Sequence, residues 1–89
     1  MIVTHYTGWL GSGRKFDSSF DRDQPYRVRL GSKGTIEGWE EGVSSMRVGG
    51  RRRLIVPSKL GYGEAGVPGL VPPDATLIYD VELLEIEPR

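Results

Sequence analysis

Glycine and proline interrupt this chain so often that it has little room for long helices. Thirteen glycines and six prolines occur among its 89 residues, and both residue types disfavour the interior of a helix. The apolar residues accordingly fall in short blocks, which is typical of a small domain rich in strands. They still make up 37% of the chain, which indicates a folded rather than a disordered protein. We expect a single domain over residues 1–89.

Four short segments have the composition of β-strands. They are rich in β-branched and aromatic residues, and glycine or proline turns bound them. In the longest, Leu77, Tyr79 and Val81 alternate with polar residues, which predicts one buried face and one exposed face. In another, tyrosine, valine and leucine alternate with arginines. The four predicted strands are residues 2–10, 26–30, 54–56 and 76–86.

Only one segment has the spacing of a helix. Apolar residues recur in it at i, i+3, i+7 and i+10, the pattern of one face of a short helix. They are Ile36, Trp39, Val43 and Met46. The predicted stop is Gly49, and two glycines inside the helix weaken it by about 1 kcal/mol each relative to alanine, so tertiary packing must hold it. With loops mainly at residues 17–25 and 60–74, the predicted class is α+β, an antiparallel sheet with one short helix packed on it.

Charge and composition exclude several kinds of site. The chain has no cysteine and one histidine, which excludes disulfides, cysteine-based zinc sites and two-histidine metal sites. Its twelve basic and twelve acidic side chains balance, which disfavours sequence-independent binding to nucleic acid. No apolar run approaches the roughly 20 residues of a membrane span, and the first residues lack the pattern of a signal peptide. We expect a soluble, cytoplasmic domain with no metal, no cofactor and no membrane or nucleic-acid partner.

Some local motifs are better explained by structure than by chemistry. Residues 61–66 match G-x-G-x-x-G, but a proline-rich stretch follows where a dinucleotide site needs a helix, so we predict a turn. The aspartates between residues 17 and 23 lack the glycine and glutamate of a calcium loop. The three arginines at 51–53 are expected to form a solvated strand edge, with a nucleic-acid patch as the weaker alternative. His5 is expected to be a hydrogen-bonded structural residue.

One set of aromatic and aliphatic side chains comes from loops as well as strands. A packed core explains any one of them, but four are tyrosines, whose hydroxyl groups need partners when buried. An apolar concavity with a few polar groups is the usual form of a small-molecule or peptide site. The set consists of Tyr6, Phe16, Tyr26, Ile36, Trp39, Tyr62, Val71 and Tyr79.

Six blocks along the chain match, in order, the motifs of one enzyme family. They are residues 5–8 (His-Tyr-Thr-Gly), 15–19 (Lys-Phe-Asp-Ser-Ser), 36–43 (Ile-Glu-Gly-Trp-Glu-Glu-Gly-Val), 61–63 (Gly-Tyr-Gly), 71–77 (Val-Pro-Pro-Asp-Ala-Thr-Leu) and 80–84 (Asp-Val-Glu-Leu-Leu). Over residues 3–87 the chain closely resembles the FK506-binding (FKBP-type) peptidyl-prolyl cis-trans isomerases. The resemblance implies a twisted antiparallel sheet wrapped around a short helix, with a pocket between them.

The resemblance also implies roles for particular residues. Trp39 would form the pocket floor, and Asp17 would lie in a network with Tyr6 and Arg22. The Ile36 N–H and the Tyr62 hydroxyl would bind carbonyl oxygens of the ligand. The implied catalytic residues are Tyr6, Asp17, Ile36 and Tyr62. The implied contacts to substrate or to macrolides such as FK506 and rapamycin are Tyr6, Phe16, Asp17, Arg22, Tyr26, Thr35, Ile36, Trp39, Tyr62, Val67, Leu70, Val71 and Tyr79.

This chemistry agrees with the residues present. Rotation about a peptide bond has a barrier of about 18–20 kcal/mol, but it breaks no bond and needs no nucleophile. We therefore expect an isomerase that acts on X-Pro bonds in peptides and proteins and is inhibited by FK506 or rapamycin. The alternative is a binding module that holds proline-containing segments or partners with little turnover.

The sequence departs from the family pattern in two ways. Family members carry an edge strand ahead of the block at 5–8, and without it the strand near residues 51–56 would be an open edge that invites pairing with another chain. We expect either lower stability than a relative with that strand or a strand-sharing dimer or partner. Tyr26 and Tyr79 stand where the best-known relatives have phenylalanine, which keeps the ring and adds a hydroxyl group.

Overall fold

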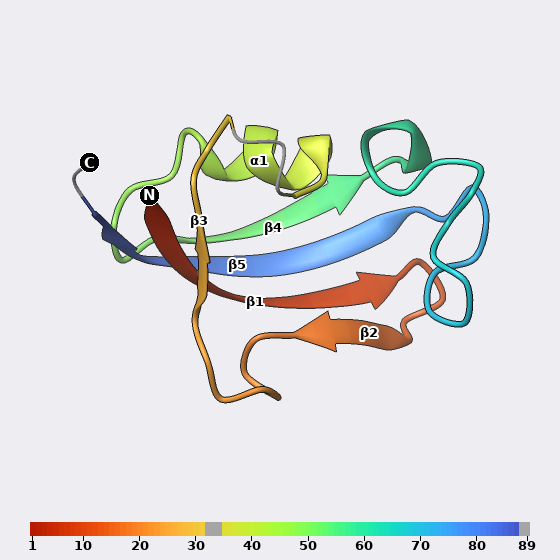
Figure 1. Cartoon of the computed structure of the whole chain (residues 1–89), viewed down its shortest axis with the longest axis horizontal. Helices are drawn as coiled ribbons and strands as arrows, with labels where there is room; N and C mark the ends of the chain where they lie inside the picture. The colour runs from red at the N-terminus through yellow and green to blue at the C-terminus, as the bar shows by residue number, and fades with distance from the viewer. Residues whose placement is uncertain (32–34, 88–89) are drawn as a thin grey trace.

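The computed structural model describes residues 1–31 and 35–87 and shows one antiparallel sheet with a short helix lying along one face (Figure 1). The strand order is β2-β1-β5-β4, and β3 also pairs with β1. The elements are β1 (Ile2–Leu10), β2 (Lys15–Ser18), β3 (Tyr26–Val28), α1 (Glu37–Val43), β4 (Arg51–Val56), a 3₁₀ turn (Ser58–Leu60) and β5 (Leu77–Ile86). The predicted α+β class is confirmed.

The central strand, β5, carries the predicted alternation. Every second side chain from Leu77 to Leu83 is at most 4% exposed. These side chains form the hydrophobic core together with Trp39 and Val43, the two buried residues of α1. Only two side chains of α1 therefore anchor the helix on the sheet. Their packing fixes the position of the α1 residues that could form a site.

Three strands differ from the sequence prediction. β4 begins at Arg51 rather than at residue 54, because Arg51 and Arg53 already pair with Glu82 and Asp80 of β5. β3 ends at Val28 rather than at Leu30, because Val28 already pairs with Ile2 at the start of β1. β2 was not predicted at all, since four residues of mixed charge and polarity show no strand pattern by themselves.

The predicted end of the helix is also wrong. α1 ends at Val43, six residues before the glycine expected to stop it, and Met46 reaches the core from a turn. Side chains take up the last helical carbonyl groups: the Ser44 hydroxyl donates to the Glu41 carbonyl at 2.8 Å, and Arg52 Nη1 donates to the Gly42 carbonyl at 2.8 Å. In the described part of the chain, no helix has the length and apolar character needed to cross a membrane.

The two glycines inside α1 explain how so short a helix packs closely. A Cβ atom at Gly42 would lie 2.4 Å from Leu54 Cδ2, and one at Gly38 would lie 2.5 Å from Val56 Cγ1. Both partners are buried side chains of β4. The glycines thus weaken the isolated helix but let its backbone approach the sheet.

We therefore expect Gly42→Ala to destabilise the protein although alanine favours helix formation. The gain in helix propensity is about 1 kcal/mol, whereas inserting a methyl group into a packed core costs about 1–3 kcal/mol. Urea unfolding should show a net loss of up to about 2 kcal/mol. In a Leu54→Val background, which shortens the opposing side chain, the same substitution should cost less. An increase in stability for Gly42→Ala alone would contradict the close approach.

Candidate functional site

A small hollow of about 170 Å³ lies where α1, the sheet and two loops meet. Strands β1, β2, β3 and β5 each contribute one lining side chain. The lining residues are Tyr6, Asp17, Tyr26, Thr35, Trp39, Tyr62 and Tyr79. All seven belong to the set that sequence analysis predicted to contact a ligand, so residues spread over most of the chain meet at one place.

Aromatic rings standing edge-on to one another form the walls of this pocket. The Tyr6 ring lies 5.5 Å from Tyr26, 6.2 Å from Trp39 and 5.8 Å from Tyr79, each pair in an edge-to-face arrangement. Tyr26 and Trp39 make a further such pair at 5.6 Å. Edge-to-face pairs add to the stability that burial alone provides. Trp39, which the resemblance predicts as the pocket floor, lines the hollow and is only 1% exposed.

A β-bulge brings two consecutive residues of β2 toward the site. Gly8 pairs with Asp17 and Trp9 with Lys15, so Phe16 is the extra residue on β2. In a regular strand Phe16 and Asp17 would point to opposite faces, but a bulge re-aims a side chain locally. Phe16 packs edge-on against the pocket residue Tyr79 at 5.7 Å, while Asp17 lines the pocket. Phe16 thus contacts a wall of the pocket without being one of its lining residues.

Gly8 makes room for this packing. It lies opposite both Asp17 and Tyr79 in the sheet. A Cβ atom there would come within 2.9 Å of the Tyr79 ring and 3.0 Å of the Phe16 ring. The glycine of the His-Tyr-Thr-Gly block therefore lets two aromatic rings close over β1.

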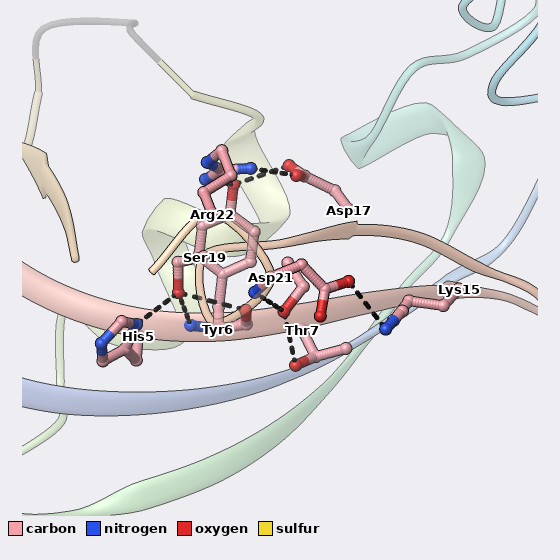
Figure 2. Close-up of polar contacts among 9 residues, drawn as sticks. His5, Tyr6, Thr7, Lys15, Asp17, Ser19, Asp21 and Arg22 are labelled. Carbon is pink, nitrogen blue, oxygen red and sulfur yellow. Dashed lines mark hydrogen bonds and ion pairs between the residues drawn. The ribbon is translucent and has the colours of Figure 1, made fainter. Parts of the chain in front are cut away.

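A polar network joins Tyr6, Asp17 and Arg22 at the rim of the pocket (Figure 2). The Tyr6 hydroxyl donates to Asp17 Oδ2 at 2.6 Å, and Arg22 Nη1 donates to Asp17 Oδ1. Arg22 Nη2 also donates to the Tyr6 hydroxyl oxygen at 3.1 Å, and the guanidinium lies 5.7 Å from the centre of the Tyr6 ring. The three side chains hold one another in place, which is the arrangement that the resemblance implied.

Ser19 and His5 fasten the loop that carries Arg22, and sequence analysis gave Ser19 no role. The buried Ser19 hydroxyl accepts from the Tyr6 backbone N–H at 2.8 Å, and the Ser19 N–H donates to the Tyr6 carbonyl at 3.0 Å. His5 Nδ1 lies 2.7 Å from the same hydroxyl (Figure 2). His5 therefore makes the structural hydrogen bond expected of it. The Ser-Ser pair after Asp17 was the only available signal for this clamp.

Burial changes the acidity of two pocket phenols. Desolvation raises the pKa of Tyr6 from its usual 10.0 to about 12; the hydrogen bond to Asp17 adds to the shift and Arg22 opposes it. Burial, and then the neighbouring Tyr62 hydroxyl, raise the pKa of Tyr79 as well. Hydrogen bonds to Tyr6 and then to Asp17 raise the pKa of Arg22. At neutral pH Tyr6 is thus a fixed hydrogen-bond donor.

The Tyr6 shift predicts a loss of stability at alkaline pH. A phenol whose folded pKa is raised contributes stability that is complete below its unfolded pKa near 10 and is lost as the pH rises toward 12. Between neutral pH and pH 11, the free energy of unfolding should fall by about 1 kcal/mol more in the wild type than in Tyr6→Phe. Urea unfolding across this range measures the difference. Identical pH profiles would show that Tyr6 ionises as easily folded as unfolded.

The other predicted ligand contacts lie around the pocket rather than in its lining. Ile36 occupies the N-cap position of α1, and among the described residues none accepts a hydrogen bond from its N–H. Val67 and Leu70 lie on a tight turn closed by paired bonds between Val67 and Val71. Val71, predicted as a wall, is 3% exposed and belongs to the hydrophobic core, outside the pocket lining. Tyr62, by contrast, is one of the seven lining residues and is 37% exposed.

The three arginines of β4 all have partners within the chain. Arg53 donates to both oxygens of Asp80 at 2.7 and 3.0 Å, and this bond lowers the pKa of Asp80. Arg51 lies 3.5 Å from Glu82, and Arg52 binds the end of α1. This pattern supports a solvated strand edge rather than a nucleic-acid patch.

Comparison with known proteins identifies the family. The family model for FKBP-type peptidyl-prolyl cis-trans isomerases matches residues 1–84. The chain belongs to this family. An FK506-binding protein of Neisseria meningitidis serogroup A is 54% identical to this chain over 85 residues. The matched region covers 96% of this chain and 78% of that protein. An FK506-binding protein 2B of Rhizopus delemar is 53% identical over 98% of this chain and 42% of its own length.

Solved structures of the family agree with the fold. FkpA from Escherichia coli superimposes on this chain with a TM-score of 0.89 and 46% sequence identity. The superposition covers 98% of this chain and 39% of FkpA. AtFKBP13 gives a TM-score of 0.91 at 35% identity, covering 97% of this chain and 78% of that chain. The twisted sheet around one short helix is therefore the family fold.

Proposed function

We propose that this FKBP-type domain is a peptidyl-prolyl cis-trans isomerase that acts on X-Pro bonds of peptides and proteins in the pocket above Trp39. The observation that carries the proposal is the pocket itself, in which aromatic walls surround a hydroxyl-bearing rim. The family name and the names of relatives as FK506-binding proteins support it. FK506 and rapamycin are proposed as inhibitors that bind at the same pocket.

The geometry suits an amide that must twist. Rotation removes the resonance of the peptide bond and costs about 18–20 kcal/mol in solution. The twisted amide has less charge separation than the planar one, so walls poor in water favour it over the ground state. Polar groups fixed at the rim can hold the twisted geometry without reorganising during the reaction. The residues of this chain need only bind, orient and exclude water.

Each rim group has a proposed part. The Tyr62 hydroxyl and the Ile36 N–H donate to carbonyl oxygens on either side of the rotating bond. Asp17 already accepts hydrogen bonds from Tyr6 and Arg22, so its carboxylate fixes the polar end of the pocket. Tyr6 holds its ring against three aromatic neighbours and its hydroxyl against Asp17. Together they fix the orientation of the substrate relative to the Trp39 floor.

An isomerisation assay on a proline tetrapeptide tests this function. With the domain present, the cis isomer should disappear much faster than in the uncatalysed reaction, which takes tens of seconds or longer at 25 °C. FK506 or rapamycin should abolish the acceleration. If the domain binds FK506 but leaves the rate unchanged, the alternative of a binding module with little turnover is correct. If neither binding nor acceleration is seen, both proposals fail.

Removal of single rim groups should have modest effects. Tyr62→Phe and Asp17→Ala each delete hydrogen bonds worth about 0.5–1.5 kcal/mol, which corresponds to a two- to tenfold loss of kcat/KM. Glu64→Gln, an exposed change on the same turn as Tyr62, is the matched control and should keep full activity. Full activity of Tyr62→Phe would remove the hydroxyl from the mechanism.

We also propose a partner at the open edge of β4, namely a second copy of this chain. β4 pairs with β5 on one side, and no strand of residues 1–31 or 35–87 lies on its other side. Its Ile55 side chain is 71% exposed. In an antiparallel pairing of two copies centred on Leu54, Arg53 of one copy lies opposite Ile55 of the other, so like charges do not face each other directly.

Sedimentation over a range of concentrations tests this dimer. The mass should double at high concentration, and Ile55→Lys should return it to the monomer because a lysine would then face Arg53. Isomerase activity should be unchanged in Ile55→Lys, since the pocket lies on the other side of the sheet. A monomeric wild type at every concentration would rule out the dimer.

A further inference from the structure

A second hollow adjoins the candidate pocket. It has a volume of about 630 Å³, and its lining residues are Arg22, Gln24, Pro25, Tyr26 and Arg27. We call it the side hollow. Tyr26 lines both it and the pocket. Arg22 joins the two as well, because it donates to Asp17 and Tyr6 in the pocket. A chain leaving the pocket over Tyr26 therefore enters the side hollow directly.

Size indicates that a substrate needs such a neighbour. Sites for drug-sized ligands span about 300–1,000 Å³, whereas the pocket offers about 170 Å³. That volume suits one ring rather than a peptide or a macrolide. The residues flanking a bound proline must therefore lie on surface outside the pocket, and the side hollow is large enough for one of them.

The lining of the side hollow is rich in hydrogen-bond donors. It includes two guanidinium groups and the Gln24 amide, and among the described residues none of its lining side chains is acidic. Glu87 accepts from Arg27 at 3.0 and 3.1 Å, and both bonds come from Nη1. In the described part of the chain nothing accepts from Nε or Nη2 of Arg27, whose side chain is 60% exposed. Asp17, the partner of Arg22, lines the pocket instead.

We propose that the side hollow is a substrate subsite that selects an acidic side chain near the isomerised proline, with Arg27 as its specificity-determining residue. The inference rests on the proposed isomerase function. Arg27 is suited to the task because its planar guanidinium can offer two parallel donors to a carboxylate. Arg22 adds positive charge at the border with the pocket, where it also orients Asp17 and Tyr6.

Peptides that differ only in charge test the subsite. Each peptide carries one proline. A Glu, Gln or Lys stands at a single varied position, either one of the two residues before the proline or one of the two after it, and kcat/KM is measured for every peptide. At the position that reaches the side hollow, Glu should exceed Lys by about three- to tenfold, the size expected of partly exposed ion pairs. The preference should vanish in 1 M salt, where the screening length falls to about 3 Å.

Variants of Arg27 provide the decisive comparison. Arg27→Gln should remove the preference and Arg27→Glu should reverse it, while turnover of the neutral Gln peptide stays at the wild-type level. Arg14→Glu changes the net charge equally, in the turn at the far end of β2, and should leave the preference intact. Turnover of all peptides without charge preference would overturn the subsite but not the isomerase. No turnover of any peptide would instead overturn the isomerase.

Discussion

Trp39→Ala should destabilise the protein more than any other change to the pocket. The side chain is 1% exposed and meets Tyr6 and Tyr26 edge-on. Replacing a buried tryptophan by alanine costs about 3–5 kcal/mol, a large share of the 5–15 kcal/mol that is typical of a whole domain. For a chain of this size the melting temperature should fall by more than about 12 °C. Thermal unfolding followed by circular dichroism measures the shift.

The helix is the reason for so large an effect. α1 has seven residues and buries only Trp39 and Val43. Isolated helices shorter than about 12 residues are marginal in water, so α1 exists because it is docked. Without Trp39, one of these two buried side chains, the helix should detach from the sheet. The pocket would then lose its floor, and the Ile36 N–H would no longer be held in place. Isomerase activity should therefore disappear under conditions where the remaining protein still folds.

The other tryptophan is a control within the same chain. Trp9 lies on the opposite face of the sheet, half-buried, with the Arg53 guanidinium 6.0 Å from its ring centre. An exposed cation–π contact contributes about 0.5–1 kcal/mol, so Trp9→Ala should lower stability only slightly and leave activity unchanged. Equal losses for the two variants would contradict the assignment of Trp39 as the anchor of α1.

The sequence allowed some parts of this site to be predicted and not others. Alternation along β5 and the helical spacing of Trp39 and Val43 depend on local periodicity, and both predictions were confirmed. The seven lining residues could be found through the family resemblance, although its motif blocks contain only four of them, Tyr6, Asp17, Trp39 and Tyr62. The bulge at Phe16 could not, because a bulge depends on the register between two strands rather than on the composition of either.

Long-range hydrogen bonds were also beyond local patterns. Ser19 fastens its loop to Tyr6, thirteen residues away, and Arg52 takes up a helical carbonyl across ten residues. Each bond forms only after the strands have paired, so neither leaves a periodic signal. The premature end of α1 has partly the same origin, since Arg52 of β4 binds the Gly42 carbonyl where the apolar spacing predicted further helical turns.

Among pocket variants that keep α1 docked on the sheet, Phe16→Ala should give the largest loss of activity. Phe16 is half-buried and packs on Tyr79 behind the pocket wall. Without its ring, water reaches the wall and the Tyr79 ring loses its edge-on support. We expect kcat/KM to fall by about tenfold or more, equivalent to at least 1.4 kcal/mol of transition-state stabilisation. Isomerisation of a neutral proline tetrapeptide measures the effect, and Phe16→Leu should restore most of the activity.

Phe20→Ala is the matched control for this prediction, because Phe16 and Phe20 are the two phenylalanines of the chain. Phe20 is 53% exposed and stacks on His5 at 4.3 Å, away from the pocket lining. Its removal should leave kcat/KM at the wild-type level. Two equally active variants would mean that the wall behind Tyr79 does not exclude water during the reaction. A loss confined to Phe16→Ala, with both proteins folded, would instead place the twisting amide against the wall that the bulge in β2 supports.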